Sequence, residues 1–404
     1  MALGGLTVTV LVLGRVEVPD DLGNWAQGPL DGEVVLTLSR HDGAVVAGTR
    51  GGLYRLGPEG TVQRDLGVEG PVHALVTGAD GRLWAGTDEG AAPVEETGGD
   101  HALDGTSVLA LGRQGTSLLA GSDSGAWRLG DSGTWERLWP PDTSEPAPVR
   151  AVTGAPAGIL LSHPDGLALL RGDGRVEIVV PGVEILALGS WNGSGELWAG
   201  TRGAPLLLIS RDGGLTWTAS SDGLRFSTLN AVAQDPTDPS ALTAGGSGLA
   251  DGTGNAGTQQ SQDAGLTWTG EQGRLTNTHI FAMASTAEPL RLRVRVSGTS
   301  WSTTVPLPVT TTRWYAGTNG AGVATLRPAV PALEALAATT PYLRLLEPLL
   351  AGLFLVVLTV WAYRHPGTAR NPAQRGPPRA SPSPNQASRT GRTTTDHDNA
   401  GANP

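Results

Sequence analysis

A four-residue apolar motif recurs seven times along this chain, and no other feature restricts its fold so strongly. Successive copies begin 37, 36, 41, 36, 44 and 51 residues apart. The copies are Val35–Leu38, Val72–Leu75, Val108–Leu111, Val149–Val152, Ile185–Leu188, Leu229–Val232 and Ile280–Met283. A short turn and a second strand-like run follow each copy, and this run mostly ends in small residues, as in Val45–Thr49 (VVAGT).

Third and fourth strand-like runs complete most units, as in Gly125–Leu129 and Thr134–Leu138. Four short strands in roughly 40 residues is the period of a β-propeller blade. A four-stranded sheet that is apolar on both faces must stack on neighbours around an axis, and the small residues let the inner strands approach closely. The sequence therefore predicts an all-β fold with a seven-bladed propeller over residues 22–328. Six or eight blades are the alternatives, because Thr286–Arg313 interrupts the last unit.

The last unit lacks a fourth strand, and the N-terminal part of the chain offers one. The third strand of this unit ends at Leu326, and a proline-rich connection follows. Before the first motif lies Leu22–Leu30, whose tryptophan matches the fourth strands that carry Trp217 and Trp268. We expect Gly23–Gln27 to complete the last blade, which fastens the ring and removes an exposed strand edge.

Composition restricts the classes of ligand. The chain has 59 glycines, 29 prolines, no cysteine and a formal net charge of −10. It therefore has no thiolate site, and it lacks the basic surface of a nucleic-acid binder. Its seven histidines show no paired spacing suited to zinc. The glycine-rich loop 249–262 has few carboxylates for calcium, although binding there stays open. We expect no metal and no cofactor.

The C-terminal part has the pattern of a membrane anchor. Leu345–Tyr363 is 19 residues long and uncharged from Leu349 onward, close to the ~20 residues that a helix needs to cross a bilayer. Trp361 and Tyr363 suit the membrane interface, and arginines follow at once, which favours a cytoplasmic tail. We predict a linker (329–341), a single transmembrane helix (342–363), a disordered cytoplasmic tail (364–404) and an extracytoplasmic propeller.

The N-terminal residues 1–21 form an apolar segment with two interpretations. An export signal would suit the predicted topology, although no basic residue precedes the apolar run and no clear cleavage site follows it. The alternative is a β-strand, because Thr7–Val12 alternates as strands do. The sequence favours the signal.

Two eight-residue segments share the pattern S-x-D-x-G-x-T-W. They are Ser210–Trp217 and Ser261–Trp268, each at the same place in its unit. This pattern resembles the Asp-box of bacterial-neuraminidase repeats (BNR, sialidase-like propellers). The resemblance implies a hairpin between the third and outermost strands, with structural roles for Ser210, Asp212, Gly214, Trp217, Ser261, Asp263, Gly265 and Trp268. The two aspartates would accept backbone N–H bonds, the two glycines would take positive φ, and the tryptophans would pack between blades.

The resemblance to sialidases also raises the question of catalysis. Sialidases of this fold use three arginines on a substrate carboxylate, a tyrosine–glutamate nucleophile pair and an aspartate acid, after an Arg-Ile-Pro-type motif. This sequence has no such motif and only four tyrosines, Tyr54, Tyr315, Tyr342 and Tyr363. No tyrosine–glutamate pair or arginine triad can be assembled from the pattern, so we expect no catalytic residues and no enzyme.

A binding surface remains. The turns after the second strands supply polar residues that we call the rim residues: Arg50, Asp88, Asp123, His163, Arg202 and Asn319. The connections between blades add Glu69, Arg225 and His279. Polar side chains that converge on one axial opening make a concave site. We expect a membrane-anchored, non-catalytic scaffold that binds a protein or glycan. The alternatives are a sialidase-like hydrolase and a sensor ectodomain, since the early blades resemble sensor propellers and, more weakly, photosystem-assembly propellers.

Overall fold

The computed structural model describes residues 14–17, 19–57, 61–94, 103, 105–141, 145–191, 195–249, 257–270, 275, 279–296 and 302–328. Strands are the only extended regular elements in these ranges, so the all-β prediction is confirmed for them. In the part of the chain that is described, no helix has the length and apolar character of a membrane span. The predicted linker, transmembrane helix and tail, residues 329–404, lie outside the described residues, as do residues 1–13.

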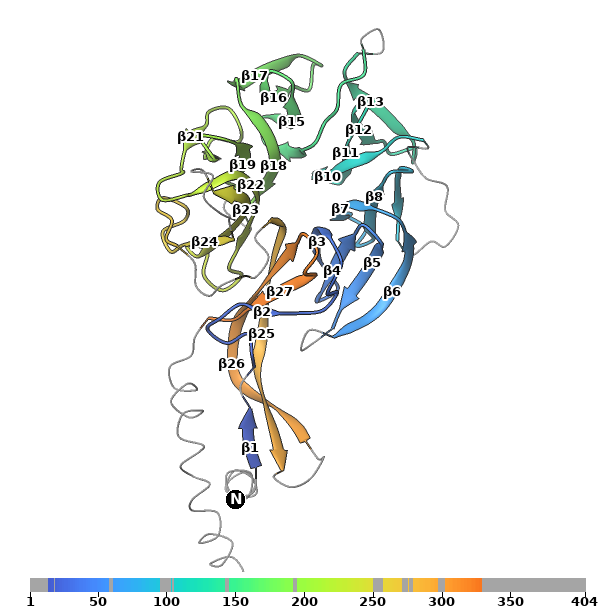
Figure 1. Ribbon diagram of the computed structural model, residues 1–404. Coiled ribbons are helices and arrows are strands. Elements are labelled where there is room, and N and C mark those ends of the chain that lie inside the picture. Colours follow the sequence, from blue (N-terminus) through green and yellow to red (C-terminus); the bar gives the residue numbers. More distant parts are fainter. Residues whose placement is uncertain are drawn as a thin grey trace, which may run out of the picture. The chain divides into compact units, whose positions relative to one another are not determined.

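Antiparallel sheets arise mainly from strands that are consecutive in the chain (Figure 1). The first contains β3 (Val35–His41), β4 (Ala44–Thr49), β5 (Gly52–Leu56) and β6 (Val62–Glu69). The second contains β7 (Val72–Thr77), β8 (Leu83–Thr87) and β9 (Ala91–Pro93). The third contains β10 (Val108–Gln114), β11 (Ser117–Ser122), β12 (Gly125–Leu129) and β13 (Trp135–Trp139). The fourth contains β14 (Val152–Ala155), β15 (Gly158–His163), β16 (Gly166–Leu170) and β17 (Val176–Pro181).

The remaining strands form two larger sheets. One comprises two groups joined by the pairing of Arg202 with Thr228. Its first group is β18 (Glu184–Ser190), β19 (Leu197–Arg202), β20 (Leu207–Ser210) and β21 (Thr218–Ala219), and its second is β22 (Phe226–Gln234), β23 (Leu242–Leu249) and β24 (Thr258–Ser261). The other, the closing sheet, has the order β1 (Gly14–Glu17), β25 (Ile280–Val296), β26 (Ser302–Thr318), β27 (Val323–Leu326) and β2 (Ala26–Gln27).

The first strands of these groups form the centre of the fold. They are β3, β7, β10, β14, β18, β22 and β25, and each contacts the next in chain order. Strand β25 returns to contact β3, so the ring is closed (Figure 1). Antiparallel sheets around such a ring make a β-propeller, which confirms the predicted architecture at this level. The number of blades stays a prediction.

A glycine in the second strand sets the distance between neighbouring sheets. At six such glycines, an added Cβ atom would come within 2.8 Å of the residue that opens the next apolar motif. The pairs are Gly48 with Val72, Gly86 with Val108, Gly121 with Val149, Gly200 with Leu229, Gly245 with Ile280, and Gly317 with Val35. The last pair joins the end of the ring to its start. The repeated Ala-Gly-Thr therefore permits the close approach that the sequence predicts, and apolar layers fill the space between sheets.

The closing sheet takes its outer strand from the N-terminal part of the chain. Ala26 pairs with Thr325 and Gln27 with Ala324, so β2 lies beside β27. The Trp25 side chain is buried in the same apolar cluster as Trp314. Within the predicted segment Gly23–Gln27, Ala26 and Gln27 form the outer strand of the closing sheet. That this segment completes the last blade stays a prediction.

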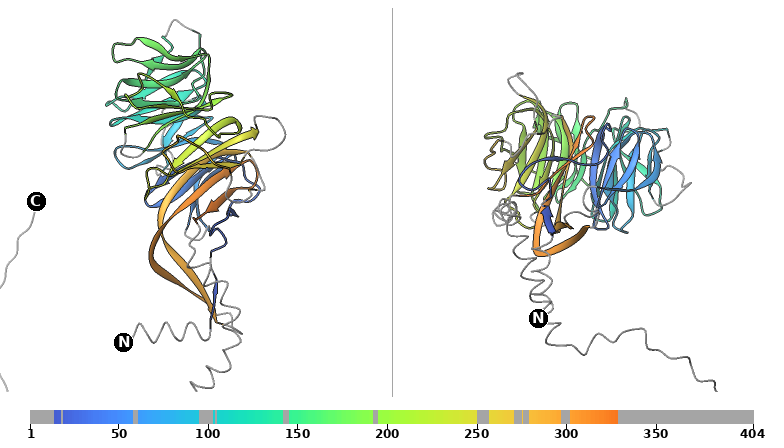
Figure 2. Two further views of the ribbon diagram at one scale, coloured as in Figure 1. Left: turned by 90° about the vertical axis from the view of Figure 1, so that its left-hand side faces the viewer. Right: turned by 60° about the horizontal axis from the view of Figure 1, so that its bottom comes forward.

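The segment Thr286–Arg313, which interrupts the repeat, is part of a long β-hairpin. Strands β25 and β26 pair from Ile280 and Thr318 at the ring to Arg295 and Ser302 at the far end. Figures 1 and 2 show the distal half of this hairpin projecting beyond the other sheets. Strand β1 pairs with the distal part of β25, Gly14 opposite Val296. Residues 14–17, which the sequence assigns to the N-terminal segment, thus belong to this sheet.

Candidate functional site

Three of the rim residues, Arg50, Asp123 and Asn319, sit on turns that a buried hydroxyl holds in shape. Thr49, Ser122 and Thr318 end the second strands of their sheets, and each is buried. Their side-chain oxygens donate to the carbonyls of Gly52 (3.1 Å), Gly125 (3.0 Å) and Gly322 (2.8 Å), respectively. A hydroxyl at the strand end therefore closes each turn and leaves the next residues exposed.

Asp88 has the most developed polar contacts among the rim residues. Its carboxylate lies 2.8 Å from Nε2 of His73 and accepts a hydrogen bond from Ser107 at 2.9 Å. The hydrogen bond with His73, followed by that from Ser107, lowers the pKa of Asp88. The backbone of Asp123 also donates to the Ser107 carbonyl, so Ser107 connects two of the rim residues.

A second pair of rim residues meets where the ring closes. The Arg50 amide donates to the Val34 carbonyl, and Val34 forms a β-bridge with Asn319. The Asn319 amide donates to the carbonyl of His279. The backbone thus brings Arg50, Asn319 and His279 together, although these contacts carry no chemistry of their own.

Arg202 and His163 make contacts within their own parts of the ring. Arg202 Nε lies 2.7 Å from the Glu184 carboxylate in an exposed ion pair. His163 packs its ring 4.9 Å from that of Trp139, between centroids, and accepts a hydrogen bond from the Asp165 amide. The described contacts therefore link the rim residues in small groups rather than in one network, and the connection residues Glu69 and Arg225 join none of these groups.

The two Asp-box segments have the geometry that their resemblance implies. Ser210 ends β20 and Thr218 begins β21, so the first box connects a third strand to a fourth. Asp212 Oδ1 accepts hydrogen bonds from the amides of Leu215 (3.1 Å) and Thr216 (2.9 Å). In the second box, Asp263 Oδ1 accepts from the amide of Thr267 at 2.9 Å. Membership of the Asp-box family itself stays a prediction.

The glycines and tryptophans of these boxes also lie as expected. Gly214 and Gly265 have φ values of 99° and 86°, a region that favours glycine. Trp217 packs against the apolar layer between β14–β17 and β18–β21. Trp268 is buried in the next layer, where Nε1 donates to the Ser220 carbonyl at 3.2 Å. The tryptophans of the two boxes therefore pack in the apolar layers between neighbouring sheets.

Hydrogen bonds stabilise the ionised carboxylates of both boxes. The Thr216 side chain and amide, in that order, lower the pKa of Asp212 to about 2. Thr267 does the same for Asp263, whose pKa is also about 2. Both aspartates are therefore hydrogen-bond acceptors at neutral pH, which is a structural role and not that of a catalytic acid.

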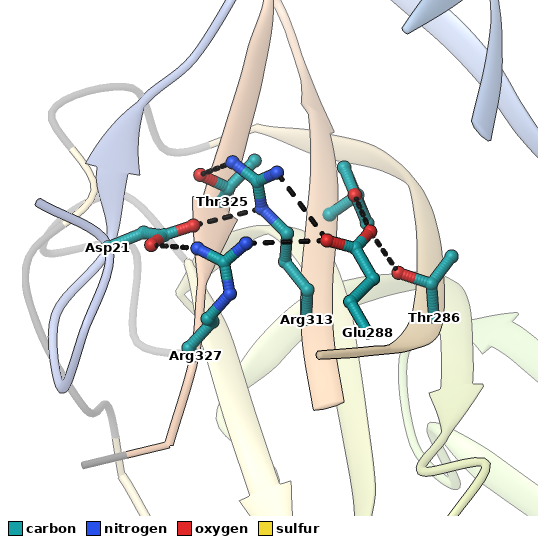
Figure 3. A network of polar contacts seen from close by, with 7 residues as sticks. Asp21, Thr286, Glu288, Arg313, Thr325 and Arg327 are labelled. Carbon is teal, nitrogen blue, oxygen red and sulfur yellow. Dashed lines mark hydrogen bonds and ion pairs between the residues drawn. The ribbon is translucent and has the colours of Figure 1, made fainter. Parts of the chain in front are cut away.

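A buried network of charges holds the N-terminal segment against the closing sheet (Figure 3). One oxygen of Asp21 lies 2.9 Å from Arg313 Nε, and the other lies 2.5 Å from Arg327 Nη1. Glu288 Oε2 lies 3.3 Å from Arg327 Nη2 and 3.9 Å from Arg313 Nη1. Asp21 and both arginines are at most 5% exposed. Glu288 is partly exposed, with 27% of its side chain accessible. The two positive and two negative charges balance, which lowers the cost of burying the other three.

Tyr315 extends this network and corrects one expectation. Its hydroxyl donates to Glu288 Oε1 at 2.7 Å, so a tyrosine–glutamate pair does exist, next to two arginines. The tyrosine of this pair is enclosed by other parts of the chain. Tyr315 is 3% exposed, burial raises its pKa to about 12, and Asp21 occupies the arginines that would bind a substrate carboxylate.

This network was not predicted from the sequence. Asp21 and Arg313 are 292 positions apart, and Glu288 and Arg313 lie inside the insertion that interrupts the repeat. Ion pairs between distant residues have no local pattern. The one available signal was that an aspartate precedes the strand that completes the last sheet.

Metal ligation finds no support among the described residues. No group of three or more histidine, aspartate or glutamate side chains within them could hold an ion. Asp251 and Asn255, the acidic and amide groups of the glycine-rich loop considered for calcium, lie outside the described residues.

Comparison with known proteins supports the fold and nothing finer. No family model matches the sequence, and no curated protein matches it. Two crystal structures of the extracellular domain of one B. thetaiotaomicron system, described as a hybrid two-component and as a one-component system, are similar. Their TM-scores are 0.52 and 0.51, at 14% identity over 77% of this chain. A domain from another hybrid two-component system of that organism has a TM-score of 0.48 at 17% identity, covering 74% of this chain and 40% of that one.

The similarity covers only part of these larger domains. The chain spans about two fifths of their length, 39% and 40% for the first two. At this level of identity the likeness establishes the β-propeller fold alone.

Proposed function

We propose that this chain is a seven-bladed, membrane-anchored, extracytoplasmic β-propeller that binds a protein or glycan partner without catalysing a reaction. The observation that carries the proposal is the buried network of Asp21, Glu288, Arg313 and Arg327. The arginines and carboxylates that a sialidase-like site would need for its substrate form ion pairs with one another in this network. Five of the six rim residues are exposed, and His163 is partly buried.

The count of seven blades rests on the seven first strands. Each contacts its neighbours on both sides, from β3 round to β25 and back to β3. Six glycine contacts repeat at equivalent places in the second strands. Seven apolar motifs, seven first strands and a closed ring agree with one another.

The location rests on sequence and on likeness. The apolar run Leu345–Tyr363 followed by arginines supports an anchor with a cytoplasmic tail. The similar structures are extracellular domains. An acidic propeller outside the membrane, bound to it at its C-terminal side, is consistent with both.

Site-specific photocrosslinking in membranes tests the binding surface. A photoreactive amino acid at Asp123, an exposed rim position, is expected to yield a discrete crosslinked product. The same probe at Asp80, which lies on the β7–β8 turn at the opposite end of the strands, is the control and should yield none. Equal labelling from both positions, or none from the rim, would contradict the proposal.

A fluorogenic sialoside tests the absence of catalysis. The full chain is expected to release no more fluorophore than its Tyr315→Phe variant, which keeps the ring and loses only the hydroxyl. Turnover that is present in the parent chain and lost in Y315F would establish the hydrolase alternative instead.

A sensor ectodomain is the second candidate, because the similar structures belong to two-component and one-component systems. Crosslinking discriminates here too. A sensor would give a product with a second copy or with a signalling partner only when its ligand is added, whereas an assembly scaffold gives a product that does not depend on added ligand.

A further inference from the structure

A cleft of about 170 Å³ lies between the β22–β24 group and the closing sheet. One wall comprises Asp235 and Asp238 on the β22–β23 turn, together with Thr243 of β23 and Gln260 of β24. Trp314 of β26 belongs to the facing wall, which is otherwise apolar. Clefts for drug-sized ligands measure roughly 300–1,000 Å³, so this one fits a group about the size of a single ring.

The cleft is not the predicted binding surface. The β22–β23 turn connects a first strand to a second, whereas the rim residues follow second strands. In antiparallel sheets these two kinds of connection lie at opposite ends of the strands. The cleft therefore lies at the end from which the β25–β26 hairpin extends.

Hydrogen bonds hold the two carboxylates of the cleft in place. Asp235 Oδ1 accepts hydrogen bonds from the amide and the hydroxyl of Thr237, both at 2.7 Å. Asp238 Oδ1 accepts from the hydroxyl and the amide of Ser240, which lower the pKa of Asp238. None of the described lining residues is basic. An anionic ligand is therefore disfavoured.

One polar group that lines the cleft has no hydrogen-bond partner. Thr243 is fully buried, and its hydroxyl has no hydrogen-bond partner. Gln260 lies directly opposite Thr243 in the strand register, and its side chain is partly exposed. A shift of the flexible Gln260 side chain would open the Thr243 hydroxyl to a ligand group that both donates and accepts.

We propose that this cleft binds a neutral, hydroxyl-rich ring, that is, one sugar unit of a glycan. Hydroxyl groups of the ring donate to the exposed Asp238, and they both donate to and accept from the partly exposed Gln260 and the exposed Gln262. The apolar edge of the ring contacts the exposed Pro328 of the facing wall. This inference does not rest on the proposed function, because the cleft and the rim residues are separate surfaces.

Saturation-transfer NMR on the full chain tests the assignment, in a detergent without a sugar headgroup. The probes are glucose, galactose, mannose and N-acetylglucosamine. We expect at least one to bind with a dissociation constant of a few millimolar or tighter, on the order of 4 kcal/mol of binding free energy. Gln260→Ala and Asp238→Asn are each expected to weaken that binding about tenfold, as loss of a hydrogen bond to a ligand hydroxyl does.

Asp80→Asn is the matched control. Asp80 Oδ1 accepts the Arg82 amide at 3.1 Å, in a turn equivalent to that of Asp238, and the variant should bind as the parent chain does. Thermal midpoints check that all variants fold. The proposal is overturned if none of the four sugars binds, or if Q260A and D238N bind unchanged. Saturation by spermidine instead of a sugar, lost in D238N, would make the cleft an amine site.

Discussion

The third and fourth strands are joined in different ways in the sheet β10–β13 and in the closing sheet. The difference shows which contacts close the ring. In the sheet β10–β13, a turn links β12 to β13, and the Gly130 amide donates to the Thr134 carbonyl at 2.9 Å. In the closing sheet no turn links β27 to β2. The two strands share the pairs Ala26–Thr325 and Gln27–Ala324. Backbone hydrogen bonds extend this contact on both sides, from the Gly28 amide to the Val323 carbonyl and from the Gly23 amide to the Arg327 carbonyl, both at 2.8 Å.

The charges follow this difference. The β12–β13 pair carries an exposed ion pair, Arg128 with Glu136, at 3.1 Å. Beside β27 and β2, the ion pairs of Asp21 with Arg313 and Arg327 are buried. Between β12 and β13 the chain is continuous, and the exposed ion pair is not needed to keep the strands together. Between β27 and β2 the chain is not continuous, and buried charges hold the N-terminal segment in the sheet. We call the contact between β27 and β2 the seam.

Arg313→Ala should have the largest effect on stability. Removal of one partner from a buried ion pair leaves an uncompensated charge and costs about 3–5 kcal/mol. Asp21 would still have its ion pair with Arg327. The variant would also lose the contact of the Arg313 guanidinium with the Tyr315 ring, whose centroid lies 5.2 Å away. Chemical denaturation measures the loss. Hydrogen exchange in R313A, compared with the parent chain, is expected to become faster at Ala26 and Gln27 and to change less in β12 and β13.

Arg128→Ala is the control for that prediction. Its ion pair with Glu136 is about half exposed, with side chains 41% and 55% accessible, and such pairs contribute about 0–1 kcal/mol. Two results would show that buried charges do not hold the seam. One is a similar loss of unfolding free energy in R128A and R313A, and the other is an unchanged rate of hydrogen exchange at the seam in R313A.

The second prediction concerns the glycine contacts, which the two sheets share. Gly121 lies on β11 and Gly317 on β26, and an added Cβ would meet Val149 O at 2.5 Å and Val35 Cγ1 at 2.7 Å. Gly121→Ala and Gly317→Ala should each cost about 1–3 kcal/mol through overpacking. Similar losses would show that the two sheets differ only at the seam.

Gly172→Ala is the matched control, since an added Cβ at that exposed glycine meets nothing within 4 Å. It should be neutral or stabilising by about 0.4–1 kcal/mol through the unfolded state. A loss in G172A as large as in G317A would mean that the close approach of sheets is not the cause. A much larger loss in G317A than in G121A would mean that the seam depends on the ring contact too.

The repeating parts of this architecture could be predicted from the sequence, because they depend on local pattern. Alternating apolar runs predicted the strands. The match of Trp25 to other fourth strands predicted the position of β2, and the Asp-box spacing predicted the turn at Asp212. Each of these features recurs in the chain, so one copy helps to identify another.

The features that occur once could not be predicted. The contact of Asp21 with Arg313 joins residues 292 positions apart, and the interruption at Thr286–Arg313 has no second copy to indicate that it forms paired strands. The pairing of Gly14–Glu17 with β25 depends on that unforeseen hairpin. The cleft at Asp238 and Gln260 likewise arises only when two sheets meet.

The third prediction uses a third kind of connection between third and fourth strands, the Asp-box of β20 and β21. Its effect is the smallest, is present at neutral pH and is lost in acid. The pKa of Asp212 is about 2 in the folded chain, below the ordinary 3.8. A lowered carboxyl pKa stabilises the fold above the unfolded pKa, and this contribution is lost as the pH falls through the folded value. The loss therefore occurs between about pH 4 and pH 2.

Denaturation midpoints of the parent chain and of Asp212→Asn, followed from pH 5 to pH 2, measure this contribution. The variant cannot titrate at this position, so the advantage of the parent chain should shrink steadily below pH 4. A gap that stays constant over this range would show that the Asp212 carboxylate does not stabilise its hairpin through its charge. The Asp-box connection would then depend on its turn geometry alone, as the β12–β13 connection does.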